Sequence, residues 1–490
     1  MFDKRGKKTS KPTQKGQDRK GISLLPPIQC ALGFELQMTN WRAYNAKTEE
    51  QFAERPPNLP EWDTFPKSSV LFKGKDFEVQ TDISDLDRLS DLEIVSVPFP
   101  ETHEGFERLN LALEHICRIL AFIPKGFPVR TIKELEAEGL GVATAPRGII
   151  VRKGLSGLVV NPQVTIGLRM DQLAKMMTSM GPGGEKEDLE MMERRDKLRM
   201  ETGFNILTHF TQRIYNVGKA LASARFGMSS YLNSLPEGSR PPLSRELDGL
   251  SALVTYYLMR GAEGTNVYPK AFTKLLARTD FGKMFSLLPP MERAHFSKNN
   301  GEEWVKLFAH ILKPESVLYE AVDWADYRDY TYYAPVRPKQ TEFGMDKPFF
   351  ESGVYKKRTG HYAHLPTDIL SSLIREDWLR AMTQGTDLLT ARNFPDPAQG
   401  HRLQSLGAMG GTVDLVGDDA SPSPIIEIRG LYSIYDNDEL KRRLKAWFAY
   451  LFATNKRMDY EFGEELHPFY TPPPPSESDD SEDNTQDDMS

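Results

Sequence analysis

Short runs of alternating hydrophobic and polar residues recur along this chain. In "PIIEIRGLYS", residues 424–433, Ile426 and Ile428 alternate with Glu427 and Arg429. Strand side chains point alternately to opposite faces, so this strand would present an acid and a base on one face. The same reading predicts strands at residues 31–38, 69–80, 92–97, 147–152, 158–168 and 424–432.

Other segments have the spacing of amphipathic helices. In the segment that follows "PFPETH", the residues Phe106, Leu109, Leu113, Ile116 and Leu120 recur at intervals of three and four. The run "DNDELKRRLKAWFAYLFA" repeats this pattern, with Asp436 or Asn437 as its cap. Further helices are predicted at 243–262 and 269–278 and over most of 171–234, with a flexible loop at 181–187 and a long ordered loop at 325–365.

Four of the predicted strands share one design, with an apolar face and a polar face. The polar positions are Glu35 and Gln37, then Glu93, then Gln163 and Thr165, and finally Glu427 and Arg429. We therefore expect an α+β fold: a curved, largely antiparallel sheet with helices on its convex face and a polar concave face. An antiparallel sheet with one solvated face gives this pattern without any functional reason.

The polar residues themselves suggest chemistry. Three carboxylates brought together on one face repel one another unless a cation lies between them. Oxygen ligands suit Mg²⁺, which commonly bridges to substrate phosphates. An arginine among them could hold a phosphate or a carboxylate through two parallel hydrogen bonds.

The order of these motifs resembles the amidoligase family, relatives of glutamate–cysteine ligase with a glutamine-synthetase-like fold. The landmarks are "GFELQ", then "LEIVSVPF" leading into a helix, then "PQVTIGL", then "IIEIRGLYSIYDNDEL" leading into the last helix. The resemblance covers residues 31 to about 453, but 171–345 has no counterpart and is expected to be a mostly helical insertion. Where the family's central strand carries two histidines, this chain has Gln163 and Thr165.

The resemblance implies an ATP- and Mg²⁺-dependent ligase that joins a carboxylate to an amine. It assigns catalysis to Arg429 and Glu427, with Arg429 on the transferred phosphoryl group or the acceptor carboxylate. It assigns the metal to Glu35, Glu93 and Glu427, and the nucleotide side to Gln37, Gln163 and Thr165. Gln37 stands where the family has a second glutamate.

A vaguer resemblance, over residues 20–290, is to proteins encoded beside bacterial contractile injection systems, which include injected toxins. It leaves two alternatives open beside an active ligase. The fold could serve as a catalytically degenerate binding or cargo protein of such a system, or toxin chemistry could reside in residues 171–345. The expected partners are carboxylate and amine substrates, among them a peptide or protein, and an injection apparatus.

Composition narrows the classes of protein to which this chain could belong. The 490 residues carry a net charge of −7, which argues against a dedicated nucleic-acid binder. No apolar run approaches the ~20 residues of a membrane helix, and the basic start lacks the apolar segment of a Sec signal, so we expect a cytoplasmic protein that an injection system could export. The domains expected are a disordered basic tail at 1–25, an α+β domain at 26–170 and 346–455, the helical insertion at 171–345, and a disordered acidic tail at 470–490.

Other candidate residues have plainer explanations. Cys30 and Cys117 lie in apolar surroundings, which favours buried thiols over a nucleophile, a disulfide or a zinc site. His361 and His364 lack a third ligand. Gly282 is expected to close a helix, with Arg278 or Asp280 reaching the site as the alternative.

Overall fold

The fold is taken from a computed structural model of the chain. It describes residues 30–44, 65, 68–83, 90–122, 130–145, 149–152, 159–180, 197–198, 200–204, 217–262, 275–312, 333–334, 356–357, 374–385, 394–395, 402–403, 415–417, 422–429 and 431–456.

An antiparallel sheet forms the centre of the described part of the chain. It has 11 strands there, in the order β10-β15-β9-β1-β4-β3-β2-β7, with β5 and β8 also on β1 and β6 on β8. The strands are β1 (Ala31–Tyr44), β2 (Val70–Gly74), β3 (Phe77–Ile83), β4 (Ser90–Ser96), β5 (Phe99–Pro100), β6 (Arg130–Thr131), β7 (Val142–Ala143), β8 (Ile149–Arg152), β9 (Val160–Gly167), β10 (Leu275–Ala277) and β15 (Ile425–Ile428). This confirms the predicted α+β class with an antiparallel sheet.

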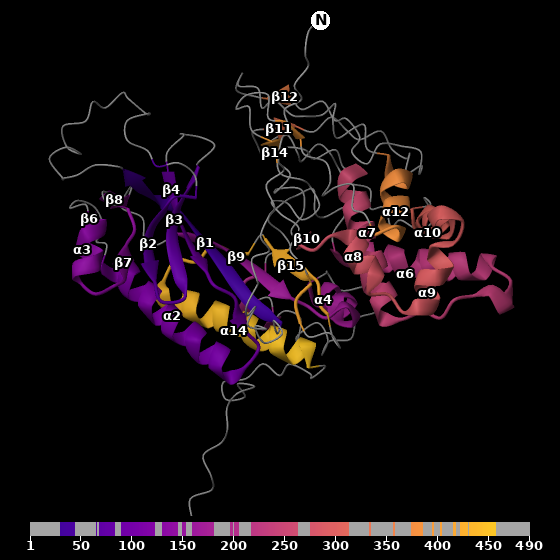
Figure 1. Ribbon diagram of the computed structural model, residues 1–490, viewed down its shortest axis with the longest axis horizontal. Helices are drawn as coiled ribbons and strands as arrows, with labels where there is room; N and C mark the ends of the chain where they lie inside the picture. Colours follow the sequence, from indigo (N-terminus) through magenta and orange to yellow (C-terminus); the bar gives the residue numbers. More distant parts are fainter. Residues whose placement is uncertain are drawn as a thin grey trace, which may run out of the picture.

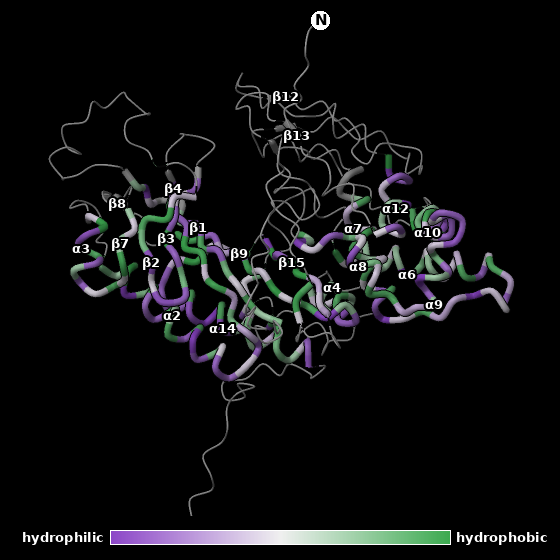
Figure 2. Tube along the Cα trace, in the orientation of Figure 1, coloured by the Kyte–Doolittle hydropathy of each residue, from purple (hydrophilic) through white to green (hydrophobic). Residues whose placement is uncertain are grey.

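Two long helices, α2 (His103–Phe122) and α14 (Asn437–Asn455), lie side by side against the sheet (Figure 1). Every residue of the two predicted hydrophobic stripes is buried. The ring centroids of Phe106 and Phe448 lie 5.5 Å apart, so the two helices contact each other through these side chains. Asp436 caps α14, because its Oδ1 accepts from the Glu439 amide at 2.7 Å. The apolar faces of β1, β4 and β9 join the same core, and Figure 2 shows hydrophobic positions gathered along these strands.

Of the remaining helices, α3 (Ile132–Ala137) lies against β6 and β7, and the others pack beside the sheet, several of them around aromatic residues (Figure 1). Phe281 lies against both Tyr257 and Trp378, and Trp304 against Phe285 and Phe296. These elements are α3 (Ile132–Ala137), η1 (Met170–Gln172), α4 (Leu173–Met180), α6 (Val217–Ser234), η3 (Glu237–Ser239), α7 (Arg245–Ala262), α8 (Phe281–Ser286), α9 (Pro290–Phe296), α10 (Lys298–Ile311) and α12 (Arg375–Thr383). None of the described helices has the length and apolar character that a bilayer span requires.

Two expectations about residues 269–282 were wrong. Leu275–Ala277 form the edge strand β10 rather than the end of a helix, because this fully buried apolar run pairs with β15. Gly282 lies in the first turn of α8 rather than at a helix end, since the Asp280 carboxylate accepts from its amide at 2.7 Å. The expected insertion at 171–345 therefore supplies a strand to the central sheet.

Other boundaries changed less. The strand expected at 69–80 is a hairpin of β2 and β3, because the chain turns at Asp76, whose φ is +67°. The loop expected at 181–187 lies outside the described residues. Most of the loop expected at 325–365 does too, apart from β11 (Tyr333–Ala334) and β12 (Lys356–Lys357), which pair; β13 (Phe394–Pro395) pairs with β14 (Arg402–Leu403). The domain boundaries remain predictions.

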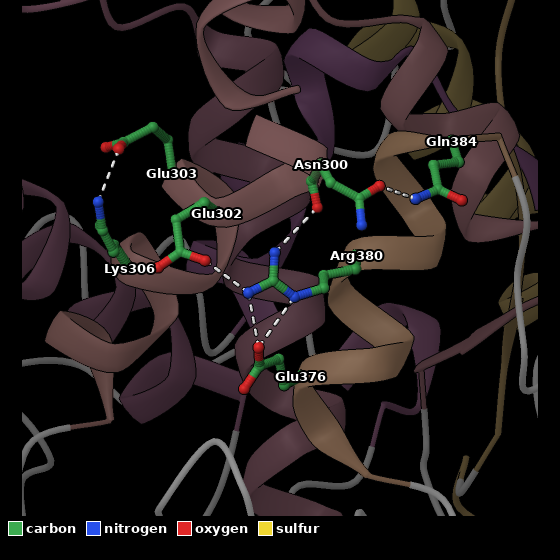
Figure 3. A network of polar contacts seen from close by, with 7 residues as sticks. All are labelled: Asn300, Glu302, Glu303, Lys306, Glu376, Arg380 and Gln384. Atoms are coloured by element: carbon green, nitrogen blue, oxygen red, sulfur yellow. Dashed lines mark hydrogen bonds and ion pairs between the residues drawn. The ribbon is translucent and has the colours of Figure 1, made fainter. Parts of the chain in front are cut away.

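Arg380 links α12 to α10 through hydrogen bonds and an ion pair (Figure 3). Arg380 donates to Glu376 on its own helix at 2.6 Å, and across to Glu302 at 2.5 Å and to the Asn300 carbonyl at 3.0 Å. Asn300 and Gly301 have positive φ, at 60° and 79°, so the carbonyl that Arg380 reaches belongs to a kinked turn. Arg380 thereby holds the kink and the neighbouring helix together.

Replacing Arg380 with glutamine is expected to lower the free energy of unfolding by about 1 kcal/mol, because two partly exposed ion pairs and one backbone contact are lost. Urea denaturation measures this. Lys306→Gln is the matched control: it removes an exposed pair with Glu303 on a single helix, and we expect a loss below about 0.5 kcal/mol. Equal losses in the two variants would contradict the joint role of Arg380.

Candidate functional site

The polar residues of the predicted strands share one face of the sheet. Residues paired directly across antiparallel strands point to the same side, and the register pairs Glu427 with Thr165, Gln163 with Glu35, and Gln37 with Glu93. We call this surface the polar face; its members are Glu35, Gln37, Gln80, Glu93, Asn161, Gln163, Thr165, Glu427 and Arg429. The opposite side, with Phe34, Leu36, Ile94 and Val164, is buried in the core.

A buried carboxylate joins two arginines at one end of the polar face. Glu427 is only 3% exposed. One of its oxygens accepts from Arg278 Nη1 at 3.1 Å, and the other lies 3.5 Å from Arg429 Nε. With its amide oriented to satisfy both neighbours, Gln163 donates to Glu427 at 2.9 Å and accepts from Arg429 Nη2 at 3.2 Å. We call these four residues the arginine cluster.

The position of Arg278 follows from the pairing of β10 with β15. Its amide donates to the Ile425 carbonyl at 2.8 Å, and the Ile425 amide donates to Thr279 Oγ1 at 2.8 Å. Asp280 then begins α8. The strand pairing and the helix start thus hold the Arg278 backbone on both sides, directly beside Glu427.

Within its four residues, the arginine cluster has two arginines and one carboxylate. Arg278 and Arg429 are both largely buried, and Glu427 supplies the single carboxylate of the cluster. Arg429 Nη1 is buried, and within the described part of the chain no group accepts from it. A buried donor without a partner is costly, so we expect a bound anion to accept from this atom and complete the cluster.

The fit of the polar face to a divalent metal is partial. Among the described residues, no three or more His, Cys, Asp or Glu lie close enough together to hold a metal ion. The assignment of Glu427 to a metal stays a prediction that its contacts do not favour, because its two oxygens already face Arg278, Gln163 and Arg429. Glu35 and Glu93 are diagonal neighbours on β1 and β4, and one or two carboxylates are enough for Mg²⁺ when substrate phosphates complete its shell.

Several polar residues near the site were absent from the sequence-based assignment. Gln80 donates to Glu93 at 3.5 Å, and Asp82 accepts from Gln37 at 3.4 Å. The alternation in "EVQTD" is the signal that would have placed both on the polar face. Arg42 and Asp91 form a buried ion pair where β1 shifts its register against β4. No sequence pattern marked that pair.

The two cysteines are not among the residues of the polar face. Cys117 is buried as expected, and burial raises the pKa of its thiol to about 11, which keeps it protonated near neutral pH. Cys30 is half-buried at the start of β1. His361 and His364 lie outside the described residues.

Glu101, which directly follows β5, has a raised pKa. Asn455 Nδ2 donates to it at 2.5 Å, and Asn455 also donates to the Gly167 carbonyl at 2.9 Å, which links α14 to β9. Burial raises the pKa of Glu101 from 4.5 to about 8. The folded chain therefore holds a proton that the unfolded chain releases near pH 4.5.

Stability should consequently fall as the pH rises from about 5 to about 8, because the folded state binds more protons over this range. Glu101→Gln should remove the part of this dependence that Glu101 supplies, with a gain on the order of 2 kcal/mol relative to wild type at the upper pH. Urea denaturation at both ends of the range measures it. Glu104→Gln, at an exposed position of the same segment, is the control and should leave the pH dependence unchanged. Parallel curves for wild type and Glu101→Gln would contradict the expectation.

No family model and no curated protein matches this chain. Among solved structures, the chain is similar to the ACD domain of a Vibrio cholerae VgrG toxin, a mutant in complex with ADP and Mn²⁺. The identity is 11% and the TM-score 0.33, covering 85% of this chain and 98% of that chain. A likeness of this size carries no argument about activity.

Proposed function

We propose that the polar face is the site of an ATP-dependent ligase that joins a carboxylate to an amine. In this proposal Arg278 and Arg429 bind the transferred phosphoryl group or the acceptor carboxylate. Glu427 orients both arginines. Glu35 and Glu93 are the carboxylates available to a divalent metal on the nucleotide phosphates, and Gln37, Gln163 and Thr165 line the nucleotide side.

The observation that carries the proposal is the buried donor Arg429 Nη1, from which no group in the described part of the chain accepts and which is left to bind an anion. Phosphoryl transfer depends mainly on positioning and on neutralising the charge of the phosphate oxygens. Two preorganised guanidinium groups beside a pair of carboxylates supply those requirements. The reaction type comes from the amidoligase resemblance of the strand motifs.

The chemistry proceeds in two steps. A carboxylate oxygen of the acceptor attacks the γ-phosphorus of ATP, and ADP leaves with the electrons of the broken P–O bond. The amine then attacks the carbonyl carbon of the acyl phosphate, inorganic phosphate leaves, and the amine releases a proton. A bound divalent metal would neutralise phosphate charge, while Arg278 and Arg429 would hold the same oxygens through hydrogen bonds.

The test is turnover by the full chain with ATP and Mg²⁺, using a peptide mixture as the carboxylate source and hydroxylamine as the amine. We expect ADP formation together with hydroxamates, and loss of both in Glu35→Gln. Absence of ATP binding at millimolar concentration would exclude the ligase. ADP formation that is equal in Glu35→Gln would indicate another site or a contaminating ATPase.

A second function is favoured by the contacts of Glu427 and by Gln163 and Thr165. Glu427 is committed to the arginines, and Gln163 and Thr165 are weaker metal ligands than the histidines of the resembled family. The polar face would then bind an anionic ligand without turnover, in a cargo or binding protein of an injection system. ATP binding that is lost in Arg429→Gln, without ADP formation, would favour this function.

A further inference from the structure

A second cationic site lies in the helical part of the molecule. A cavity of about 440 Å³ opens between the C-terminal half of α6 and the start of α7. It is lined by Arg225, Met228, Ser229, Leu232, Asn233, Arg240, Leu243, Ser244, Arg245 and Asp248. We call it the helical pocket. It shares no residue with the polar face, so it does not depend on the function proposed above.

The walls of the helical pocket are strongly basic. It has three arginines and one carboxylate, a local charge of +2 in a chain whose net charge is −7. Arg225 is paired to Asp248, with Nε 3.1 Å from both carboxylate oxygens and Nη2 2.6 Å from one of them. That pairing fixes the Arg225 guanidinium and raises its pKa.

The other two arginines keep most of their donors available. Arg240 Nε makes one long hydrogen bond to the Leu235 carbonyl, at 3.4 Å. Arg245 is exposed, and no hydrogen bond or ion pair joins its side chain to the described part of the chain. The Glu292 carboxylate accepts from the Ser244 amide and hydroxyl, at 2.6 and 2.7 Å. Among the described residues, no carboxylate forms an ion pair with Arg240 or Arg245.

The charge and lining identify the class of ligand. A phosphate monoester carries about two negative charges at neutral pH, which matches the local excess, whereas one carboxylate would leave a positive charge unmatched. Arginine forks fit phosphate oxygens in pairs. Met228, Leu232 and Leu243 give an apolar side, and none of the described residues that line the pocket is aromatic, so none of them can stack on a base. The volume lies within the ~300–1,000 Å³ usual for small-molecule sites.

We propose that the helical pocket binds a phosphate monoester with a short aliphatic portion. Arg240 and Arg245 bind the phosphate oxygens. Arg225, held by Asp248, forms the third side of the phosphate site, and the aliphatic part lies against Leu232 and Leu243. A free metabolite and a lipid headgroup share this chemistry.

Calorimetric titration of the full chain with glycerol 3-phosphate tests the proposal, and flotation with phosphatidylcholine vesicles containing phosphatidic acid tests the lipid source. The variant is Arg240→Gln with Arg245→Gln, and the matched control is Arg118→Gln, an exposed arginine on α2. Both positions of the variant are exposed, so the fold should be retained, which thermal denaturation verifies. We expect saturable binding to at least one probe, weakened about tenfold or more in the double variant and unchanged in the control, because charge-assisted hydrogen bonds are lost.

Binding of glycerol 3-phosphate points to a metabolite, and binding of vesicles alone points to a lipid headgroup; each supports the phosphate site. Three results overturn it: no saturable binding of either probe at about 10 mM, well beyond the millimolar range of weak sites; equal weakening in Arg118→Gln; or tighter binding of a Glu-rich peptide than of both probes. Mg²⁺–ATP titration of the double variant separates the two sites, because the polar face keeps its arginines there.

Discussion

Replacing Glu427 with leucine is expected to lower the free energy of unfolding by about 3 kcal/mol, because two largely buried arginines lose a carboxylate that they share. The carboxylate is 3% exposed and contacts Arg278, Arg429 and Gln163. Removing it leaves two like charges next to each other inside the sheet. Urea denaturation of the full chain near neutral pH measures the loss.

Glu427→Gln is the control, since an amide oxygen still accepts a hydrogen bond while the charge is lost. We expect a smaller loss of about 1–2 kcal/mol. Phosphate or triphosphate added to Glu427→Leu should restore part of the stability by pairing with the guanidinium groups that have lost Glu427. If Glu427→Leu were as stable as wild type, the arginines would have other counter-charges, and the arginine cluster would not be short of an anion.

Arg429→Gln is expected to weaken Mg²⁺–ATP binding by about 10- to 100-fold, the range for the loss of charge-assisted hydrogen bonds to a phosphate. Arg429 has a buried donor, Nη1, without a partner in the described residues, so a bound anion gains most there. Isothermal titration of the full chain gives the affinity. Arg429→Lys keeps the charge but not the planar fork, so its affinity for ATP should lie between those of wild type and Arg429→Gln.

Arg118→Gln is again the matched control and should bind ATP like wild type. Equal affinity in wild type and Arg429→Gln would contradict the role of the arginine cluster. A weaker affinity accompanied by a lower unfolding midpoint would require comparison at a temperature where both proteins are folded.

The sequence correctly predicts the helices and strands whose hydrophobic residues recur regularly over a long segment. The stripes of Phe106 to Leu120 and of Leu440 to Leu451 are buried as expected in α2 and α14. Alternation in β1, β4, β9 and β15 also places the seven predicted site residues on one side of the sheet, since strand period and register leave few choices.

The sequence does not predict β10, although it offers Arg278 as an alternative residue of the site. A short, fully apolar run such as Leu275–Ala277 has no period, so it cannot be told from a buried helix end. Only its pairing with β15 brings Arg278 to Glu427, across 149 positions of the chain. The assignment of Glu427 to a metal has the same limit as a sequence-based prediction. The alternation places Glu427 on the polar face, but it does not determine which hydrogen-bond donors its carboxylate contacts.

A crystal structure of the full chain with Mg²⁺ and a non-hydrolysable ATP analogue tests the central claim most directly. We expect phosphate oxygens within about 3 Å of the guanidinium groups of Arg278 and Arg429, the distance of a charge-assisted hydrogen bond. Glu35 or Glu93 should face the metal on those phosphates. A nucleotide bound elsewhere, in the helical pocket or among residues 171–345 away from Arg278, would contradict the account.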